Sequence, residues 1–416
     1  MTPPKMSSFN PTDTDVRAAA FSVIERCGGA EGLLRAAAGS ALYPHVWTRD
    51  VGLAALGILA AARTASDRAL VADSLACIAR HQDPLGRMPL KVDVAEDCSV
   101  LENSAGVDAG MWFALATHHL AQASPDLAEP LVEPALRAMA WVAHLDVNGD
   151  LLLETPEASD WADMMPHRHH VLFVNVLYVA ALRAAAALSG QAAHAELADK
   201  VAERVAVLFA VHAQTDAEAV GAHLARLSTW NPEWALTAEY ASKWGELPFL
   251  LPYVGFRAVG RHCDVVGNSL AILTGVADAP RSAAILDYFH AVGVADPWPS
   301  KTSYPPLYPG DPDYRDHFHW RNLNLPHHYQ NGGSWPFCGA LHGLALVHAG
   351  RLGAAEVHYR SLVNACFSEE DHPFPEWQHG VTGRAMGERD QLWSATGVLL
   401  LGEALRTGRV PYFGHP

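Results

Sequence analysis

The sequence lacks the features that mark secreted and disulfide-rich proteins. Its 416 residues include only six cysteines, and none of them forms a C-x-x-C pair. A chain of this length does not need disulfide cross-links to fold, so we expect reduced thiols and a cytoplasmic protein. Residues 1–17 are polar and contain three prolines, unlike a signal peptide, and we expect residues 1–14 to be flexible. The cysteines are Cys27, Cys77, Cys98, Cys263, Cys338 and Cys366.

Basic residues and long apolar runs are also scarce. Lys and Arg total 29 against 45 Asp and Glu, which gives a formal net charge of −16. This charge opposes binding to a phosphate backbone or to an anionic lipid surface. The apolar stretch 171–182 ends at Arg183 and is too short to cross a bilayer. We therefore predict no nucleic-acid partner and no membrane partner, but a small neutral ligand; a homo-oligomer remains open.

Motifs for nucleotide, serine and metal chemistry are missing as well. There is no GxxxxGK[ST] phosphate loop and no G-x-S-x-G elbow. Histidines do cluster, but no HExxH and no grouped cysteine accompanies them, so the sequence offers no complete ligand set. We expect neither a metal nor a cofactor. The clusters are His167/His169/His170, His317/His319 and His327/His328.

What the sequence does contain is a series of alanine-rich segments with apolar residues at helical spacing. Alternating β-branched runs are nearly absent, so the predicted class is all-α. No linker divides the chain and no fixed repeat period occurs, so we predict one domain, residues 1–416, built as a closed helical barrel. The predicted helices are Asp15–Cys27, Leu53–Arg63, Arg68–Arg80, Ala109–Gln122, Leu131–Leu145, Val171–Leu188, Ala192–Val211, Asn268–Val276, Ala283–Val292, Gly339–Ala349, Ala354–Cys366 and Gln391–Arg406.

The segments between these helices are rich in Pro, Gly, Trp, His and acidic residues. Long aromatic loops between regular helices usually build a site on one face of a scaffold. The loops are Leu42–Asp50, Thr155–His170, Trp230–Tyr253, Asp296–Trp335 and Phe367–Gln391.

Two loop motifs are specific. His328-Tyr329-Gln330 precedes the run Asn331-Gly332-Gly333-Ser334-Trp335-Pro336, and Phe374-Pro375-Glu376-Trp377 precedes Gly380, Gly383, Gly387, Gln391 and Trp393-Ser394. They resemble the Y-H-N-G-G-S-W-P and W-P-E-Y-Y-D…G…G…Q-x-W-S segments of glycoside hydrolase family 100, the neutral and alkaline invertases.

Three upstream segments add to this resemblance. They are Val46–Asp50, which is also similar to the W-x-R-D of the glucosidase module of glycogen-debranching enzymes, Gly106–Trp112, and Gly267-Asn268. The resemblance runs from about Tyr43 to the last helix. It implies an (α/α)₆ barrel and inverting hydrolysis of a small sugar such as sucrose, with a general acid and a general base on opposite sides of a central pocket.

Inverting hydrolysis requires a protonated and an ionised carboxyl group ~6.5–9.5 Å apart, so the pair must come from separate loops. Glu376 stands between a proline that stiffens the chain and an indole that offers a sugar-stacking face. The resemblance places Glu376 on the general base; the alternative is an ordinary solvated glutamate. The acids in the aromatic loops are Asp50, Asp108, Glu154, Glu157, Asp160, Asp163, Glu233, Glu246, Asp264 and Glu376.

The general acid is predicted in the loop Ser159–Met165. Alignment with the S-C-M-I-D and W-M-D patterns of the two families selects Asp163, with Asp160 as the rival and Glu154 or Glu157 as remaining alternatives. Two acids this close can raise each other's pKa and keep one protonated. The run Met164-Met165-Pro166 replaces an R-R-M of the invertases, which removes two arginine donors and puts those sugar contacts in doubt.

Further candidates for substrate binding each have a structural alternative. Arg49 and Asp50 suit a vicinal diol, or form a helix-cap ion pair. Asp108 binds a hydroxyl, or starts a helix. The four tryptophans are stacking platforms or core residues, and the two amides can serve hydroxyls. These six are Trp47, Trp112, Trp335, Trp393, Asn331 and Gln391.

Other functions also remain. An epimerase or isomerase of the N-acylglucosamine 2-epimerase type uses the same barrel with histidines as proton carriers, for which His45, His319 and His379 are available. A silent carbohydrate-binding or scaffold protein is a third class. Among hydrolases, a glucosylglycerate-type conjugate, a sugar–glycerol conjugate or a short α-glucoside competes with sucrose as the substrate.

Overall fold

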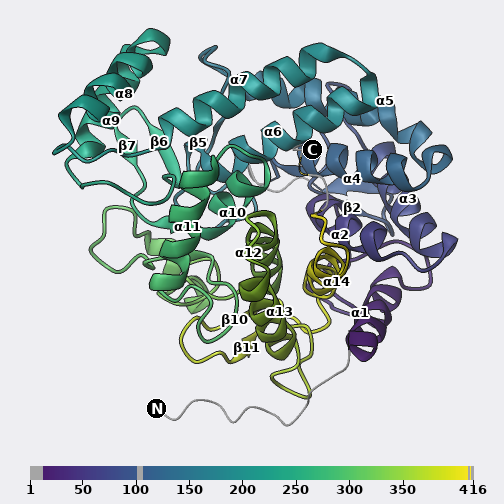
Figure 1. The fold of residues 1–416 in the computed structure, drawn as a ribbon. Helices are drawn as coiled ribbons and strands as arrows, with labels where there is room; N and C mark the ends of the chain where they lie inside the picture. The colour runs from purple at the N-terminus through teal and green to yellow at the C-terminus, as the bar shows by residue number, and fades with distance from the viewer. Residues whose placement is uncertain (1–12, 101–105, 411–412, 414–416) are drawn as a thin grey trace.

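Two rings of helices build the protein (Figure 1). The computed structural model describes residues 13–100, 106–410 and 413. The inner helices are α2 (Thr48–Ala61), α4 (Ala109–Ala123), α6 (Leu172–Ser189), α10 (Val265–Leu273), α12 (Pro336–His348) and α14 (Leu392–Thr407). The outer helices are α1 (Asp13–Gly28), α3 (Ala65–Arg80), α5 (Pro125–Val142), α7 (Ala192–Leu208), α11 (Ala279–Ala291) and α13 (Leu352–Cys366).

The inner ring is closed. Each inner helix contacts the next, and α14 contacts α2 to complete the circle. An outer helix follows α2, α4, α6, α10 and α12 in sequence, and α1 packs against α14 from outside. The fold is therefore an (α/α)₆ barrel, as the sequence predicted.

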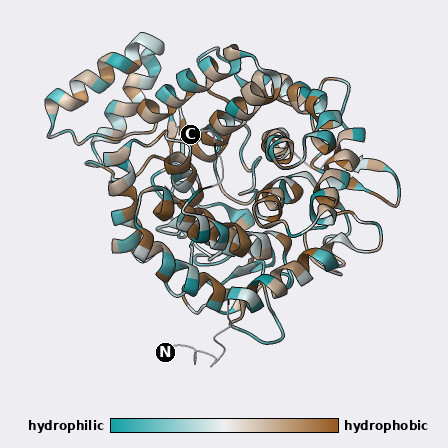
Figure 2. Cartoon of the chain, turned by 45° about the vertical axis from the view of Figure 1, so that its right-hand side comes forward, coloured by the Kyte–Doolittle hydropathy of each residue, from teal (hydrophilic) through white to brown (hydrophobic). Residues whose placement is uncertain are grey.

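The position of a helix in the inner or the outer ring determines how many of its residues are buried and apolar. All nine residues of α10 are buried, and so are residues 336–347 of α12, because an inner helix has neighbours on every side. Outer helices such as α7 bury a single stripe, and Figure 2 shows both hydrophilic and hydrophobic colours on the peripheral helices. Small residues allow the inner helices to approach closely: a Cβ on Gly57 of α2 would lie 2.2 Å from the carbonyl oxygen of Thr396 in α14.

One helix of the described residues, α6, is long and apolar enough by composition to cross a membrane. Its place in the inner ring accounts for that character, since 72% of the window is buried inside the protein. A core helix surrounded by other helices is hydrophobic all round for the same reason as a membrane span.

The twelve predicted helices are all present, with ends that differ by a few residues. The prediction of a loop over Trp230–Tyr253 was wrong in part, because α8 (Ala217–Trp230) and α9 (Pro232–Ser242) form an additional helix pair. This pair lies outside the two rings (Figure 1), and Leu227 is the only residue of α8 that is fully buried. Val220, Leu224 and Leu227 of α8 nevertheless lie at helical spacing, and the prediction overlooked this signal.

The N-terminal prediction is also partly wrong. Residues 1–12 lie outside the described part of the chain, but Asp13 and Thr14 already belong to α1.

Short strands of two or three residues connect the helices, too short to alter the all-α class. They form a sheet β1-β2-β3, a sheet β4-β5-β6-β7, and the pairs β8-β9 and β10-β11. Two 3₁₀ segments, η1 (Ala143–Leu145) and η2 (Asp316–Asn322), lie in the connections. The strands are β1 (Val46–Trp47), β2 (Lys91–Asp93), β3 (Cys98–Val100), β4 (Glu154–Thr155), β5 (His169–Val171), β6 (Tyr253–Gly255), β7 (Ala258–Val259), β8 (Cys263–Asp264), β9 (Ser303–Tyr304), β10 (Trp377–Gln378) and β11 (Ala385–Met386).

Candidate active site

The predicted site residues gather at the N-terminal ends of the inner helices. Inner and outer helices alternate along the chain, so the inner helices point in one direction and their N-termini share one end of the barrel. Strands β1, β5 and β8 run directly into α2, α6 and α10 at this end. Arg49 and Asp50 lie in the first turn of α2, Asp108 precedes α4, Trp335 precedes α12 and Gln391 precedes α14.

Glu376 is held firmly between two chain segments. Its backbone N–H donates to the Glu388 carbonyl at 2.7 Å, and the Glu388 N–H donates back to Glu376 Oε2 at 3.1 Å. The Tyr43 hydroxyl donates to the other oxygen, Oε1, at 2.7 Å. Gly387 closes the site from behind, since a Cβ there would stand 2.4 Å from Oε2, and its φ of +69° suits glycine. The carboxylate is therefore fixed in one orientation.

Burial raises the pKa of Glu376 to about 7, and the negative charges of Glu388 and Asp163 act in the same direction. The hydrogen bond from Tyr43 opposes this rise by stabilising the ionised form. The influence of Asp163 also places the two predicted catalytic carboxyls in one electrostatic neighbourhood, although they come from loops more than 200 residues apart in sequence. A carboxylate that titrates near neutrality suits a general base.

Asp163 and Asp160 occupy different settings within one loop. Asp163 is exposed to solvent, yet removal from bulk water still raises its pKa, as for a side chain at the bottom of a concave site. Gln330 Nε2 donates to Asp163 Oδ1 at 2.9 Å. Asp160 is 2% exposed, and its Oδ1 accepts the Ala162 N–H at 2.7 Å. Burial, with a contribution from Asp108, raises the pKa of Asp160 to about 8.

These settings favour different residues as the acid. The higher pKa favours Asp160, whereas solvent access favours Asp163. Access carries more weight, because a proton donor must reach the leaving oxygen to within hydrogen-bond distance. Asp160 is enclosed by protein, while the Asp163 carboxyl is open to a substrate.

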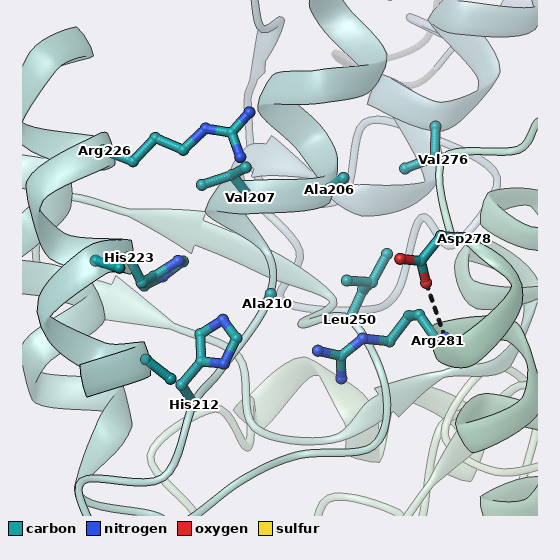
Figure 3. Close-up of a pocket in the computed structure, with 12 residues that line it drawn as sticks. Ala206, Val207, Ala210, His212, His223, Arg226, Leu250, Val276, Asp278 and Arg281 are labelled. Carbon is teal, nitrogen blue, oxygen red and sulfur yellow. Dashed lines mark hydrogen bonds between the residues drawn. The ribbon is translucent and has the colours of Figure 1, made fainter. Parts of the chain in front are cut away.

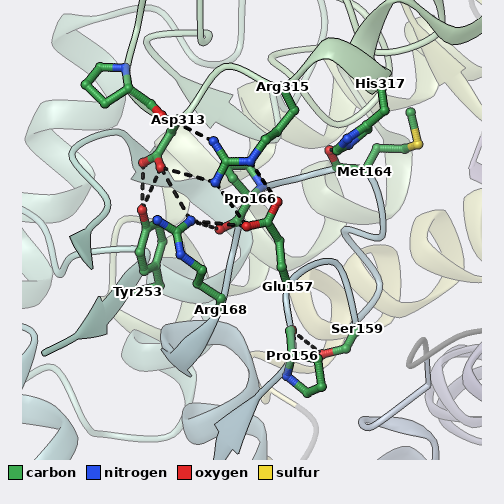
Figure 4. A network of polar contacts seen from close by, with 11 residues as sticks. Pro156, Glu157, Ser159, Met164, Pro166, Arg168, Tyr253, Asp313, Arg315 and His317 are labelled. Atoms are coloured by element: carbon green, nitrogen blue, oxygen red, sulfur yellow. Dashed lines mark hydrogen bonds and ion pairs between the residues drawn. The ribbon is translucent and has the colours of Figure 1, made fainter. Parts of the chain in front are cut away.

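Glu157, an alternative acid, is tied into an ion-pair network (Figure 4). Arg315 donates to both of its oxygens, at 2.8 and 3.0 Å, and Arg168 lies 3.4 Å away. Arg168 also reaches Asp313, which accepts the Tyr253 hydroxyl at 2.7 Å. The hydrogen bonds from Arg315 lower the pKa of Glu157, so this carboxyl is a poor proton donor. The network instead holds residues 156–168, here called the acid loop, against residues 313–315.

Arg49 and Asp108 form a bidentate ion pair, with Nε–Oδ2 at 2.7 Å and Nη2–Oδ1 at 2.8 Å. The ion pair at the helix ends thus joins Arg49 to Asp108, whereas the sequence had suggested a pair between Arg49 and Asp50. Asp50 beside them accepts no hydrogen bond from another side chain of the described residues, and burial raises its pKa to about 7. Of the three, Asp50 has the carboxyl that is available for a hydroxyl.

Several predicted sugar-binding side chains have structural tasks instead. Asn331 accepts the Leu307 N–H and donates to the carbonyls of Leu307 and Asn324, which uses its whole amide. In the orientation that satisfies both neighbours, the Gln391 amide donates to the Ala36 carbonyl and accepts the Trp393 indole N–H. The prediction that these amides bind hydroxyls is therefore not supported: both fasten loops to the barrel.

The four tryptophans divide into core and accessible residues. Trp335 is 1% exposed and its indole N–H donates to the Tyr329 carbonyl at 2.9 Å, while Trp393 stacks on Phe337 at 4.8 Å. Both are core residues, which is the structural alternative to stacking platforms that the sequence left open. Trp112 is equally buried, although its indole N–H has no partner among the described residues. Trp47 alone is half-buried.

Three residues near the site were missed. The Tyr43 hydroxyl holds Glu376. The Gln330 amide joins Asp163 to the Trp161 carbonyl and the Met164 N–H. The Lys91 ammonium lies 4.4 Å from the centre of the Trp47 ring. Gln330 directly precedes the NGGSWP run, which was the available signal. No spacing in the sequence connects Tyr43 with Glu376.

A separate cavity of about 440 Å³ lies between α7, α8 and the start of α11 (Figure 3). Its one carboxylate is Asp278, which accepts the Arg281 N–H at 2.9 Å as the cap of α11. A pocket without two free carboxyls cannot support acid–base hydrolysis of a glycoside.

Comparison with known proteins gives one matching family model. Residues 258–407 match the family model of alkaline and neutral invertase. The chain is a glycoside hydrolase. The matched part of the enzyme contains the NGGSWP run and Glu376, whereas the acid loop lies upstream of it. No curated protein sequence matches this hydrolase.

Solved structures show the same barrel. An uncharacterised conserved protein from Thermus thermophilus superposes with a TM-score of 0.67 at 15% identity, over 92% of this chain and 98% of that one. A GH63 mannosylglycerate hydrolase from the same organism, in complex with glucose, gives 0.66 at 15%, over 92% and 99%. A bacterial glucoamylase complexed with acarbose gives 0.64 at 14%, over 96% of this hydrolase and 57% of that chain. At these identities the likeness establishes the fold.

Proposed function

We propose that this hydrolase cleaves sucrose or another small α-glucoside in one displacement, with Asp163 as general acid and Glu376 as general base. The observation that carries the proposal is the pairing of a fixed, near-neutral carboxyl with an accessible one at the same end of the barrel. Asp163 donates its proton to the leaving oxygen, and Glu376 takes a proton from the attacking water. Such chemistry needs no cofactor.

A neutral substrate fits the charges of the site. Arg49, Arg168 and Arg315 are each paired with a carboxylate, so their charges are already balanced. The match to alkaline and neutral invertase points to sucrose as the first compound to test. The six cysteines are all free thiols, in keeping with our proposal of a cytoplasmic enzyme.

A sugar–glycerate conjugate is the second candidate substrate. One solved structure of similar length is a mannosylglycerate hydrolase, which adds weight to this alternative.

The epimerase alternative finds less support. His45 lies 3.4 Å from Asp93, His319 is bonded to Tyr314, and His379 packs on His328. Each has a different local partner, and none contacts Asp163 or Glu376 through a bond among the described residues. A proton shuttle requires two groups aimed at one substrate carbon.

We expect reducing sugar to be released from sucrose, with kcat/KM at least about tenfold above that for glucosylglycerate. The purified enzyme is incubated with each compound, and free glucose is measured over time. If kcat/KM for glucosylglycerate equals or exceeds that for sucrose, the conjugate and not sucrose is the natural substrate. Isomerised sugar without hydrolysis of either compound would contradict the proposal.

The pH dependence of kcat/KM is expected to be bell-shaped with an acidic limb near pH 7. Glu376 acts only as a carboxylate, and because its pKa is raised to about 7, activity falls as the pH drops through this value. Tyr43→Phe removes a hydrogen bond that stabilises the carboxylate, so the acidic limb should move to higher pH. If the acidic limb lies at pH 4–5 and does not shift in the Tyr43→Phe variant, another group is the base.

A further inference from the structure

A second cluster of ligand-type side chains lies at the neck of the acid loop. Asp150, Glu154 and His170 each direct one donor atom to a common point, and these atoms lie within 4.8 Å of one another. Glu154 and His170 are direct partners across strands β4 and β5. Residues 156–168, which carry Asp160 and Asp163, form the connection between these two strands.

The Leu153 carbonyl fixes the tautomer of a neutral His170 ring. Its Nδ1 lies 3.2 Å from the Leu153 carbonyl oxygen, which can only accept, so Nδ1 carries a hydrogen. In the neutral imidazole Nε2 is then a bare lone pair, and this atom is fully buried without a hydrogen-bond partner. It faces Asp150 Oδ2 at 3.2 Å and Glu154 Oε1 at 3.9 Å. Three electron-rich atoms that converge in this way are stabilised by a positive charge, supplied either by a proton on Nε2 or by a metal ion between them.

The distances suit a transition-metal ion. With ligand bonds of about 2.0–2.2 Å, tetrahedral ligands lie roughly 3.3–3.6 Å apart, so a small adjustment brings all three atoms into position. One imidazole and two carboxylates select Zn²⁺ or Mn²⁺ over Mg²⁺ and Ca²⁺, which prefer oxygen ligands throughout. The Glu154 side chain is 18% exposed and gives an ion a route to the cluster.

Outer contacts already hold each ligand in place. The Trp234 indole N–H donates to Asp150 Oδ2 at 3.0 Å, and the Val147 N–H donates to Glu154 Oε2 at 2.7 Å, on the oxygen that faces away from His170. His170 is held through Nδ1 by the Leu153 carbonyl. Partners of this kind orient the ligands of metal sites in proteins.

We propose that Asp150, Glu154 and His170 bind one divalent transition-metal ion, of the Zn²⁺ or Mn²⁺ type, which fastens the base of the acid loop. The ion joins the turn after α5 to strands β4 and β5, and through Trp234 to α9. It has a structural role and stands apart from Asp163 and Glu376. No motif in the sequence predicts it, because its ligands pair across two strands and a turn.

The test uses Zn²⁺ with the full chain after EDTA treatment. We expect one equivalent of Zn²⁺ per chain by mass spectrometry of the metal, and a rise in melting temperature of about 2–4 °C that EDTA reverses. Hydrogen exchange in residues 156–168 should slow when Zn²⁺ is present. Mg²⁺ at the same concentration should have no effect.

Variants separate this site from surface histidines. Glu154→Gln and His170→Asn should lose the bound equivalent and the thermal shift, whereas His319→Asn, at an exposed histidine, should keep both. Zn²⁺ bound equally by all variants would be adventitious and would overturn the proposal. If the variants fold poorly, Co²⁺ bound to the wild-type chain should give the visible absorption of a low-coordinate nitrogen–oxygen site. An imidazolium at His170 with no bound metal would show a proton in place of the ion and would also overturn the proposal.

Discussion

Glu376→Gln is expected to lower kcat on the natural substrate by about 10²–10⁴-fold while the protein folds and binds sugar as before. The amide has nearly the same shape: its oxygen can accept the Glu388 N–H, and its NH₂ can donate to the Tyr43 hydroxyl oxygen. It cannot take a proton from water. The measurement is steady-state hydrolysis, with thermal unfolding as the check on folding.

Glu388→Gln is the matched control for this variant. Glu388 contacts Glu376 through its backbone, so the change removes a nearby charge but keeps the hydrogen bonds between the two segments. Its activity should stay within about tenfold of wild type. A Glu376→Gln enzyme that keeps more than about 1% of wild-type activity would remove Glu376 from the role of base.

Asp163→Asn is expected to lower kcat on a natural glycoside by about 10²–10⁴-fold but to spare the hydrolysis of α-glucosyl fluoride. Fluoride departs without a proton, so a missing general acid matters little with this substrate. Gln330 still has a carbonyl oxygen to donate to at position 163, which keeps the loop in place. The comparison of the two substrates identifies the acid without depending on total activity.

Asp160→Asn is the matched variant. Its Oδ1 accepts the Ala162 N–H within the same loop, and the asparagine oxygen can keep this hydrogen bond, so we expect activity within about tenfold of wild type on both substrates. If Asp160→Asn loses activity on the natural glycoside but keeps it on α-glucosyl fluoride, and Asp163→Asn does not, then Asp160 is the general acid. Its higher pKa would then have outweighed the better access of Asp163.

The helical part of the fold was predictable because burial imposes a period on the sequence. Inner helices such as α12 are apolar throughout, and outer helices carry one apolar stripe, so both produce a signal. In the outlying pair, α8 carries Val220, Leu224 and Leu227 at helical spacing, which was overlooked, whereas α9 has almost no apolar period. The capping residues Asp216 and Asn231, and Pro232 at the start of α9, were the local signals available there.

The site was predictable only as far as residue type and local motif allow. Glu376 and Asp163 were predicted because unusual loops surround them, and the structure brings both to one end of the barrel. The same motifs supplied Asn331, Gln391 and Trp335, whose polar atoms are used by neighbouring backbone or side chains. Sequence cannot show which amide is already satisfied. Tyr43 and the pairing of Glu154 with His170 depend on contacts that form only in the folded chain.

The anomeric configuration of the first sugar released tests the proposed single displacement most directly. Early-time ¹H NMR on the natural substrate resolves the two anomers of the product before mutarotation mixes them. Direct attack by water activated by Glu376, with Asp163 across the bond, predicts a product of inverted configuration, that is, β-glucose from an α-glucoside. Release of α-glucose would require a closer carboxyl pair and a covalent intermediate, and would contradict the roles proposed for both residues.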